Sequence, residues 1–329
     1  MTNRRKFLQQ SGYLAMGAGL LYLGCQNEAE NGDTEPKKPI NENWFNISLA
    51  EWSLNRQIFG GEMDHLDFAR IAKETYGIGA IEYVNQFFKD KATDIPYLKQ
   101  MDRRAKDHGV KQLLIMVDGE GHLGNVDAKE RKIAVERHVK WIDAARYLGC
   151  HSIRVNAAGE GSMEEVAKAA VDGLGTLAEI AKQRGINVLV ENHGGYSSNG
   201  EWLAGVMAQI NMDNCGTLPD FGNFCIERVP DSRDCADEYD KYQGLTELMP
   251  YAKAVSAKSY NFGTDGKETA IDYHRMLRIV QRAGYEGFIG IEFEGEGPAK
   301  EGILATKALL QTAMKEVAHM PDEPVQEAG

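Results

Sequence analysis

The chain of 329 residues is 43% hydrophobic and 26% charged, a composition that is ordinary for a globular protein. Its formal net charge of −12 at pH 7 and the lack of a long basic run argue against a nucleic-acid partner. The length allows two domains, but a single α/β barrel also fits.

Residues 1–25 are typical of an export signal. Arg4 and Arg5 precede an apolar run that extends to Gly24, an order of features that resembles a Tat-type signal. The run is too short and too rich in glycine for a membrane span. Cys25 follows directly and is a candidate for lipid attachment. We therefore predict an exported protein that is periplasmic, or anchored through Cys25 to the membrane facing the periplasm.

The rest of the chain divides by composition into three parts. Residues 26–43 are polar and contain two prolines, which predicts a disordered linker. Residues 44–319 carry the regular apolar patterns of a folded domain, and residues 320–329 are predicted to be a flexible C-terminal tail.

Four cysteines remain after Cys25, and none of them forms a CxxC pair. Cys225 and Cys235 can pair in an oxidising compartment, but connectivity cannot be read from a sequence. We therefore expect all four to be small buried or loop thiols.

From residue 45 onward, short apolar strands alternate with amphipathic helical stretches. The expected strands are 46–52, 79–84, 110–118, 151–156, 186–192, 215–220, 254–260 and 288–294. The expected helices include 64–76, 134–149, 163–185 and about 300–319, and glycines that stop helices stand at 109, 149, 185 and 284. Eight such units over about 270 residues match a (β/α)8 TIM barrel. The alternative is a doubly wound sheet, but the segment after the first strand has no glycine-rich phosphate loop.

Polar side chains concentrate at the carboxyl ends of the expected strands, where barrels of this kind hold their active sites. They are Glu82, Asp118, Glu120, His122, Arg154, Asn156, Glu191, Asn192, His193, Asp220, Asn223, Ser256, Lys258, Glu292 and Glu294. The opposite strand ends are mostly apolar or glycine. This one-sided distribution predicts an active site at the carboxyl ends.

Three of these carboxylates, Glu191, Asp220 and Glu292, can converge because side chains alternate along a strand. We expect Gly290, which lies beneath Glu292 on the same face of the strand, to leave room in a crowded barrel. Three anions repel one another unless a cation lies between them, and a hard divalent ion with oxygen ligands meets that need. The alternative is that each carboxylate pairs with a base, for which Arg154, Lys258 and His193 are the candidates.

The segments VLVENHGG, GTLPDFGNF, AVSAKSYNF and GFIGIEFEGE resemble the xylose isomerase-like sugar isomerase/epimerase barrels, over about residues 45–318. The resemblance implies a divalent metal held by Glu191, Asp220 and Glu292, with Mn²⁺ as the first expectation and Mg²⁺, Co²⁺, Ni²⁺ or Zn²⁺ as alternatives. The histidine that the family carries on strand seven is replaced by Ser256, so a fourth ligand must be water, His193, Asn223 or substrate. This departure indicates a divergent exported branch that handles oxidised or unsaturated sugars.

The expected roles divide the polar residues into two groups. The candidates for catalysis are Glu191, Glu292, His193 and Lys258. The candidates for contact with a substrate are Glu82, Asp118, His122, Arg154, Asn156, Asn223 and Ser256.

The resemblance implies a metal-dependent sugar isomerase or epimerase that removes a proton next to a carbonyl group. Export and the lack of a phosphate cradle favour an unphosphorylated sugar or keto-sugar. One alternative is a hydratase or dehydratase acting on a 3-keto-sugar or its unsaturated derivative, and another is a non-catalytic sugar-binding lipoprotein. A metal-dependent hydrolase or endonuclease is a weaker reading, because the chain is acidic. A carbohydrate is the expected partner, and a homo-oligomer is compatible with the sequence.

Overall fold

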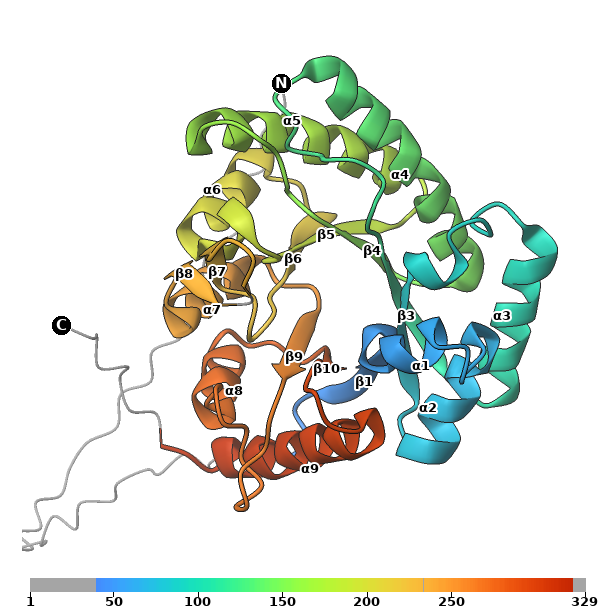
Figure 1. Ribbon diagram of the computed structural model, residues 1–329, viewed down its shortest axis with the longest axis vertical. Coiled ribbons are helices and arrows are strands. Elements are labelled where there is room, and N and C mark those ends of the chain that lie inside the picture. Colours follow the sequence, from blue (N-terminus) through green and yellow to red (C-terminus); the bar gives the residue numbers. More distant parts are fainter. Residues whose placement is uncertain (1–39, 233, 322–329) are drawn as a thin grey trace, which may run out of the picture. The chain divides into compact units, whose positions relative to one another are not determined.

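The computed structural model describes residues 40–232 and 234–321 (Figure 1). The predicted export signal with Cys25 lies outside these residues, as do most of the predicted linker and tail. Export and lipid attachment therefore stay predictions. Within the described residues, no helix combines the length and the apolar character needed to cross a membrane.

Eight parallel strands form the central sheet, in the order β6-β5-β4-β3-β2-β1-β10-β9. They are β1 Asn46–Ala50, β2 Ala80–Val84, β3 Lys111–Met116, β4 Ser152–Val155, β5 Asn187–Glu191, β6 Cys215–Leu218, β9 Val255–Ser259 and β10 Phe288–Phe293. Isolated parallel bridges from Thr217 to Ala252 and from Asp220 to Ser256 join the two ends of the sheet. The predicted TIM barrel and all eight predicted strands are confirmed, and the doubly wound alternative is excluded.

Helices surround the sheet (Figure 1). They are α1 Asn55–Phe59, α2 Phe68–Tyr76, α3 Ile95–Asp107, α4 Ala128–Leu148, α5 Met163–Lys182, α6 Gly200–Ile210, α7 Lys241–Leu248, α8 Tyr273–Arg282 and α9 Ala299–Ala318. Short 3-10 helices are η1 Glu51–Leu54, η2 His65–Asp67, η3 Asn85–Phe88, η4 Gly195–Ser198 and η5 Met249–Tyr251.

Local sequence explains where the helices begin and end. Ser162 and Glu165 form a capping box at the start of α5. Asp127 accepts hydrogen bonds from the first turn of α4, which therefore begins six residues before the predicted start at residue 134. The four predicted glycine stops all have positive φ, a conformation that side chains with a Cβ disfavour.

Apolar side chains form two separate cores. The larger one lies between the sheet and the helices. The smaller one is built from strand residues that face the barrel interior, with Trp52 and Phe87 packed against it, and contains Ala50, Val84, Leu114, Met116, Leu189, Leu218 and Ala254. Side-chain layers of this kind fill the inside of TIM barrels.

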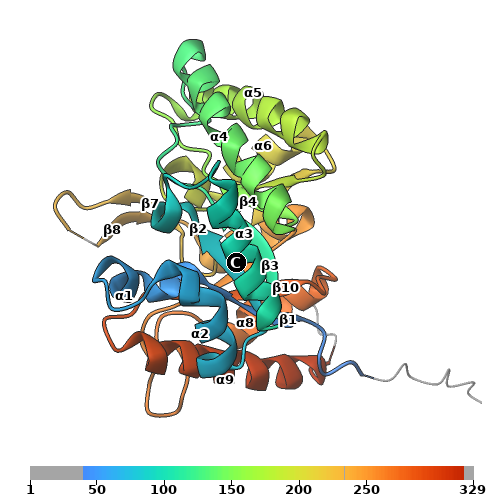
Figure 2. The same ribbon diagram turned by 90° about the vertical axis from the view of Figure 1, so that its right-hand side faces the viewer.

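A two-stranded antiparallel hairpin, β7 Cys225–Arg228 and β8 Cys235–Glu238, follows β6. It projects from the barrel on the same side as α1 (Figure 2). A disulfide joins Cys225 to Cys235, so the expectation of two unpaired thiols was wrong here. The two cysteines are ten residues apart in sequence, and they meet only because the hairpin turns between them. Cys150 and Cys215 are buried free thiols, as expected.

Candidate metal centre

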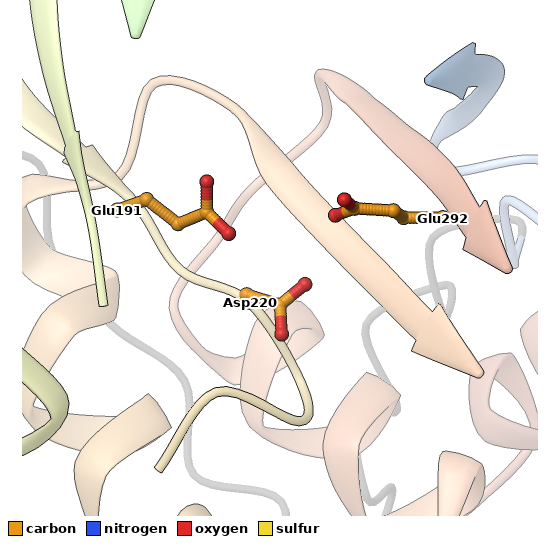
Figure 3. Close-up of side chains that lie close together, drawn as sticks. All are labelled: Glu191, Asp220 and Glu292. Atoms are coloured by element: carbon orange, nitrogen blue, oxygen red, sulfur yellow. The ribbon is translucent and has the colours of Figure 1, made fainter. Parts of the chain in front are cut away.

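Three buried carboxylates from different strands meet inside the barrel mouth (Figure 3). Glu191 is the last residue of β5, Asp220 lies just beyond β6, and Glu292 lies on β10. Each offers one oxygen, and these three oxygens all lie within 4.8 Å of one another. The structure thus brings together the three residues that the sequence selected, although their role as ligands stays a prediction.

Asp220 is held by its backbone surroundings. Its Oδ1 accepts hydrogen bonds from the backbone N–H groups of Gly222 and Asn223, both at 2.9 Å. Its own N–H donates to Asn192 Oδ1 at 2.7 Å. The other carboxylate oxygen, Oδ2, is buried without a hydrogen-bond partner. A buried acceptor left in this way is costly unless a ligand completes it.

Glu191 and Glu292 each have a cation beside them. Arg154 Nε lies 2.6 Å from Glu191 Oε2, and Asn223 Nδ2 donates to Glu191 Oε1 at 2.8 Å. Lys258 Nζ lies 3.3 Å from Glu292 Oε2, which also accepts a hydrogen bond from Ser256 Oγ at 3.0 Å. The alternative of simple ion pairing therefore holds for these two carboxylates, but Asp220 has no such contact with a cation among the described residues.

Each of the two cations is shared with a further carboxylate. Arg154 Nη1 lies 2.8 Å from Asp118 Oδ1, and Lys258 Nζ lies 3.3 Å from Glu294 Oε2. Two cations thus face five carboxylates, namely Asp118, Glu191, Asp220, Glu292 and Glu294. The carboxylates of the group therefore outnumber its cations.

Burial and the neighbouring charges together shift the pKa values of the groups in this site. Burial, with smaller effects from neighbouring carboxylates, raises the pKa of Glu191 and of Asp220 to about 7. Burial acts on Glu292 as well, but the charges of Lys258 and Arg154 outweigh it and lower the pKa of that carboxyl group. Burial disfavours the charged form of Lys258, yet the surrounding carboxylates raise its pKa well above the usual value.

This donor set fits a divalent cation. Hard ions such as Mg²⁺ and Mn²⁺ take carboxylate oxygens as ligands, and Asp220 Oδ2 is an acceptor that no protein group occupies. An ion there would supply the missing positive charge. Ser256, which stands where the family has histidine, is buried and hydrogen-bonded to Glu292.

A cavity of about 410 Å³ reaches the site at Asp118, the ion-pair partner of Arg154, but none of the three candidate metal ligands lines it; a volume of this size is typical of small-molecule sites. Four of the predicted substrate or catalytic residues line it: Asp118, His122, Asn156 and His193. Asn156 Nδ2 donates to Asp118 Oδ1 at 2.7 Å. Burial raises the pKa of Asp118, but Arg154 and His193 outweigh this effect and lower the pKa to about 2. Desolvation and the charge of Arg154 lower the pKa of His193.

Glu82 is buried, as are Arg154 and Ser256 among the other predicted substrate contacts. It is 1% exposed, and its Oε1 accepts a hydrogen bond from Ser48 Oγ at 2.6 Å. A Cβ at Gly290 would come within 2.6 Å of the same oxygen. Gly290 therefore leaves room in the crowded barrel, as expected, and the side chain of Glu82 occupies that room. Burial raises the pKa of Glu82 to about 7.

One buried polar pair escaped the sequence analysis. Glu51 follows β1 directly, and its Oε1 lies 2.6 Å from His65 Nδ1. The backbone N–H of Val84 donates to Glu51 Oε2 at 3.0 Å. Glu51 stands at the carboxyl end of a strand, so the rule applied to the other seven strands could have found it.

Fold and site together define a TIM barrel with an acidic candidate metal centre at the carboxyl ends of its strands. Residues 69–313 match the model of the Xylose isomerase-like TIM barrel family, and the chain belongs to this family. No curated protein matches the chain in sequence.

Three solved structures are examples of the same fold. A D-tagatose 3-epimerase-like protein matches with a TM-score of 0.64 and 17% identity, covering 83% of this chain and 98% of its own. The IOLI protein with a bound zinc atom matches with a TM-score of 0.64 and 17% identity, covering 84% of this chain and 100% of its own. The probable 3-DHS dehydratase AsbF from Bacillus anthracis matches with a TM-score of 0.58 and 16% identity, covering 80% and 98%. At these identities the likeness shows a shared fold.

Proposed function

We propose that the protein is a metal-dependent enzyme that isomerises or epimerises an unphosphorylated sugar or keto-sugar by removing a proton next to a carbonyl group. The observation that carries this proposal is the shortage of positive charge around Glu191, Asp220 and Glu292, together with the orphaned Asp220 Oδ2. The fold shared with an epimerase-like protein and with a zinc-containing protein supports it.

Glu191, Asp220 and Glu292 would hold the metal, with Mn²⁺ as the first candidate and Mg²⁺, Co²⁺, Ni²⁺ or Zn²⁺ as alternatives. When bound, the ion would supply Lewis-acid polarisation of a substrate carbonyl. Asn223 and Arg154 orient Glu191 through its two oxygens, and Lys258 and Ser256 orient Glu292 through one.

Glu191 and Glu292 face each other across the site and are the candidates for proton transfer (Figure 3). A carboxylate placed beside the reacting carbon can take up a proton and return it, which is general acid–base catalysis. Lys258 stays protonated and can donate a hydrogen bond to a developing oxyanion. His193, His122 and Asn156 can bind substrate hydroxyl groups in the neighbouring cavity.

A hydratase or dehydratase is the second candidate, because loss of a β-hydroxyl group can follow the same proton abstraction. The fold shared with a probable dehydratase supports this second candidate function. We also propose that the protein is exported, and the Cys225–Cys235 disulfide supports an oxidising compartment. A sugar-binding lipoprotein without catalysis would share the fold but would never exchange a substrate proton with solvent.

The test begins with the metal content of the purified mature protein, beside Glu191→Gln. We expect about one divalent ion per chain in the unaltered protein and loss of that ion in the variant. A panel of keto-sugars in D₂O should then show uptake of deuterium at carbon, while a lyase would add or remove one water. Glu62→Gln, at an exposed position, is the matched control and should keep both metal and activity. Failure to bind any metal, even after incubation with Mn²⁺, would exclude the proposal.

A further inference from the structure

Three aromatic side chains form a continuous cluster on the loops after β1 and β2. Trp52 comes from η1, Phe59 from α1 and Phe87 from η3. The ring centroids are 5.0 Å apart for Phe59 and Phe87, 6.1 Å for Trp52 and Phe87, and 6.2 Å for Trp52 and Phe59. Phe59 is 61% exposed, and the other two are half-buried. We call these three residues the aromatic wall.

The aromatic wall is continuous with the candidate metal centre. Trp52 and Phe87 pack against the apolar core inside the barrel. Trp52 Nε1 donates a hydrogen bond to Glu294 Oε1 at 2.5 Å. The other oxygen of Glu294 lies 3.3 Å from Lys258 Nζ, which lies 3.3 Å from Glu292. Two side chains therefore link the indole of Trp52 to a candidate metal ligand.

Neighbouring loops hold the aromatic wall in place. Arg56, on α1, donates hydrogen bonds to the backbone carbonyls of Glu296 at 3.1 Å and of Gly297 at 2.6 Å. Asn85, at the start of η3, exchanges two hydrogen bonds with the backbone of Asp118, at 2.9 and 3.0 Å. A surface that is rigid before binding loses little entropy when a ligand arrives.

Polar groups stand next to the aromatic wall. Glu294 accepts the hydrogen bond from Trp52, and a cavity of about 430 Å³, lined by Gln86, Lys89 and Asp118 but by none of the three rings, lies at the neighbouring residues of the chain. Apolar rings bordered by a few polar groups are typical of small-molecule sites. Pyranose rings present apolar C–H faces and polar hydroxyl edges, so they match a surface of this composition.

We propose that the aromatic wall is a second carbohydrate subsite, which binds a sugar ring linked to the ring that reacts at the metal centre. The substrate class would then be a glycoside or short oligosaccharide rather than a free monosaccharide. This inference rests on the proposed function, because it takes the metal centre as the place of the reacting ring.

The size of the aromatic wall favours a sugar over a protein partner. Fully exposed Phe and Trp side chains offer about 150–250 Å² each. Three of them, two half-buried, therefore offer well below the about 800 Å² per partner that a standard protein interface covers.

The intrinsic tryptophan fluorescence provides a direct test. The chain has four tryptophans, and Trp44, Trp141 and Trp202 are all buried, so the half-buried Trp52 is the most accessible of the four and serves as the reporter. We would titrate the metal-loaded protein with glucose, cellobiose, cellotriose and maltose. We expect a saturable change in emission, with at least one oligosaccharide binding more tightly than glucose. Trp52→Phe should remove the signal.

Phe59→Ala tests the subsite without touching the metal centre. It should weaken oligosaccharide binding by about tenfold, which corresponds to the partial burial of one phenylalanine. Its effect on glucose should be negligible. Ile133→Ala removes an exposed apolar side chain of α4 and is the matched control.

Three results would overturn this inference: no oligosaccharide binds more tightly than glucose, Phe59→Ala leaves oligosaccharide binding unchanged, or Phe59→Ala changes the oligomeric state measured by sedimentation. The metal and deuterium measurements distinguish this failure from failure of the proposed function. If protons are exchanged with monosaccharides and no oligosaccharide binds more tightly, the proposed function holds and the second subsite is wrong. If oligosaccharides bind at the aromatic wall but no substrate proton is exchanged, the second subsite holds and the proposed reaction is wrong.

Discussion

Two buried carboxylates of this barrel, Glu51 and Asp220, differ in whether the protein supplies a partner to each oxygen. Both oxygens of Glu51 have protein partners, namely His65 at 2.6 Å and the Val84 N–H at 3.0 Å. Asp220 has backbone donors on one oxygen and no partner on the other. Glu51 stands apart from the candidate metal ligands, whereas Asp220 lies beside two of them.

The difference separates a structural role from a binding role. A buried acidic group that is fully paired needs nothing else, and it ties together the segments that supply its partners. Glu51 in this way joins η1 to η2 and to β2. Carboxylates that outnumber the available cations need a further positive group. Three substitutions or conditions can break or sharpen this contrast.

The largest expected effect concerns metal affinity. Asp220→Asn removes one of three anionic ligands, and we expect Mn²⁺ to bind more than about 100-fold more weakly, since even partners outside the ligand set cost 10–100-fold. Isothermal titration with Mn²⁺ measures this directly. Glu51→Gln should leave Mn²⁺ affinity within about twofold, as these two groups do not share partners. Equal losses in both variants would show that the two groups are not distinct.

Next in size is the stability of the Glu51 pair. Glu51→Gln places an amide NH₂ opposite either the Val84 N–H or His65 Nδ1. Moving the imidazole proton to Nε2 does not help, because that atom is buried without a partner. We expect the free energy of unfolding to fall by about 1–3 kcal/mol. Urea denaturation of the metal-free protein measures it, with the exposed Glu62→Gln as control. An unchanged midpoint would mean that the pair contributes nothing.

The smallest effect is the pH dependence of the metal-free protein. Burial raises the pKa of Asp220 and of Glu191 to about 7 in the folded protein, above the ordinary values of these carboxyl groups. The folded state therefore binds more protons, so these groups lower stability progressively as the pH rises from about 4 to 7. Asp220→Asn should make this decline shallower. Saturating Mn²⁺ should remove it, because the ion replaces the protons. Melting temperatures across this range test the prediction, and a rise in metal-free stability over the same interval would contradict it.

Much of the fold could be predicted because apolar periodicity and helix-stopping glycines are local signals. All eight strands follow from short apolar runs, and Gly149 ends α4 in a left-handed conformation. The start of α4 was placed too late, because its first turn is polar and Asp127 is recognisable as a cap only once the helix is seen. The β7–β8 hairpin was missed because its strands are short, polar and largely exposed.

The candidate site was predictable in its membership but not in its balance of charge. Strand ends identified Glu191, Asp220 and Glu292, since parallel strands deliver their last residues to one face. The sharing of Arg154 and Lys258 between two carboxylates each depends on side-chain reach across the barrel. The hydrogen bond between Ser48 and Glu82 and the packing of Glu82 against Gly290 also depend on contacts between neighbouring strands.

The sequence by itself determined the class of fold and the residue types at the mouth, because strand alternation and helix capping act over a few neighbouring residues. Only the tertiary structure decided which acidic group is satisfied and which is not. Hydrogen bonds and ion pairs join residues far apart in the chain, so Glu51 finds His65 while Asp220 Oδ2 finds no partner. The folded barrel also brings Trp52, Phe59 and Phe87 into one wall, since residues from separate loops become neighbours only when the strands close into a ring.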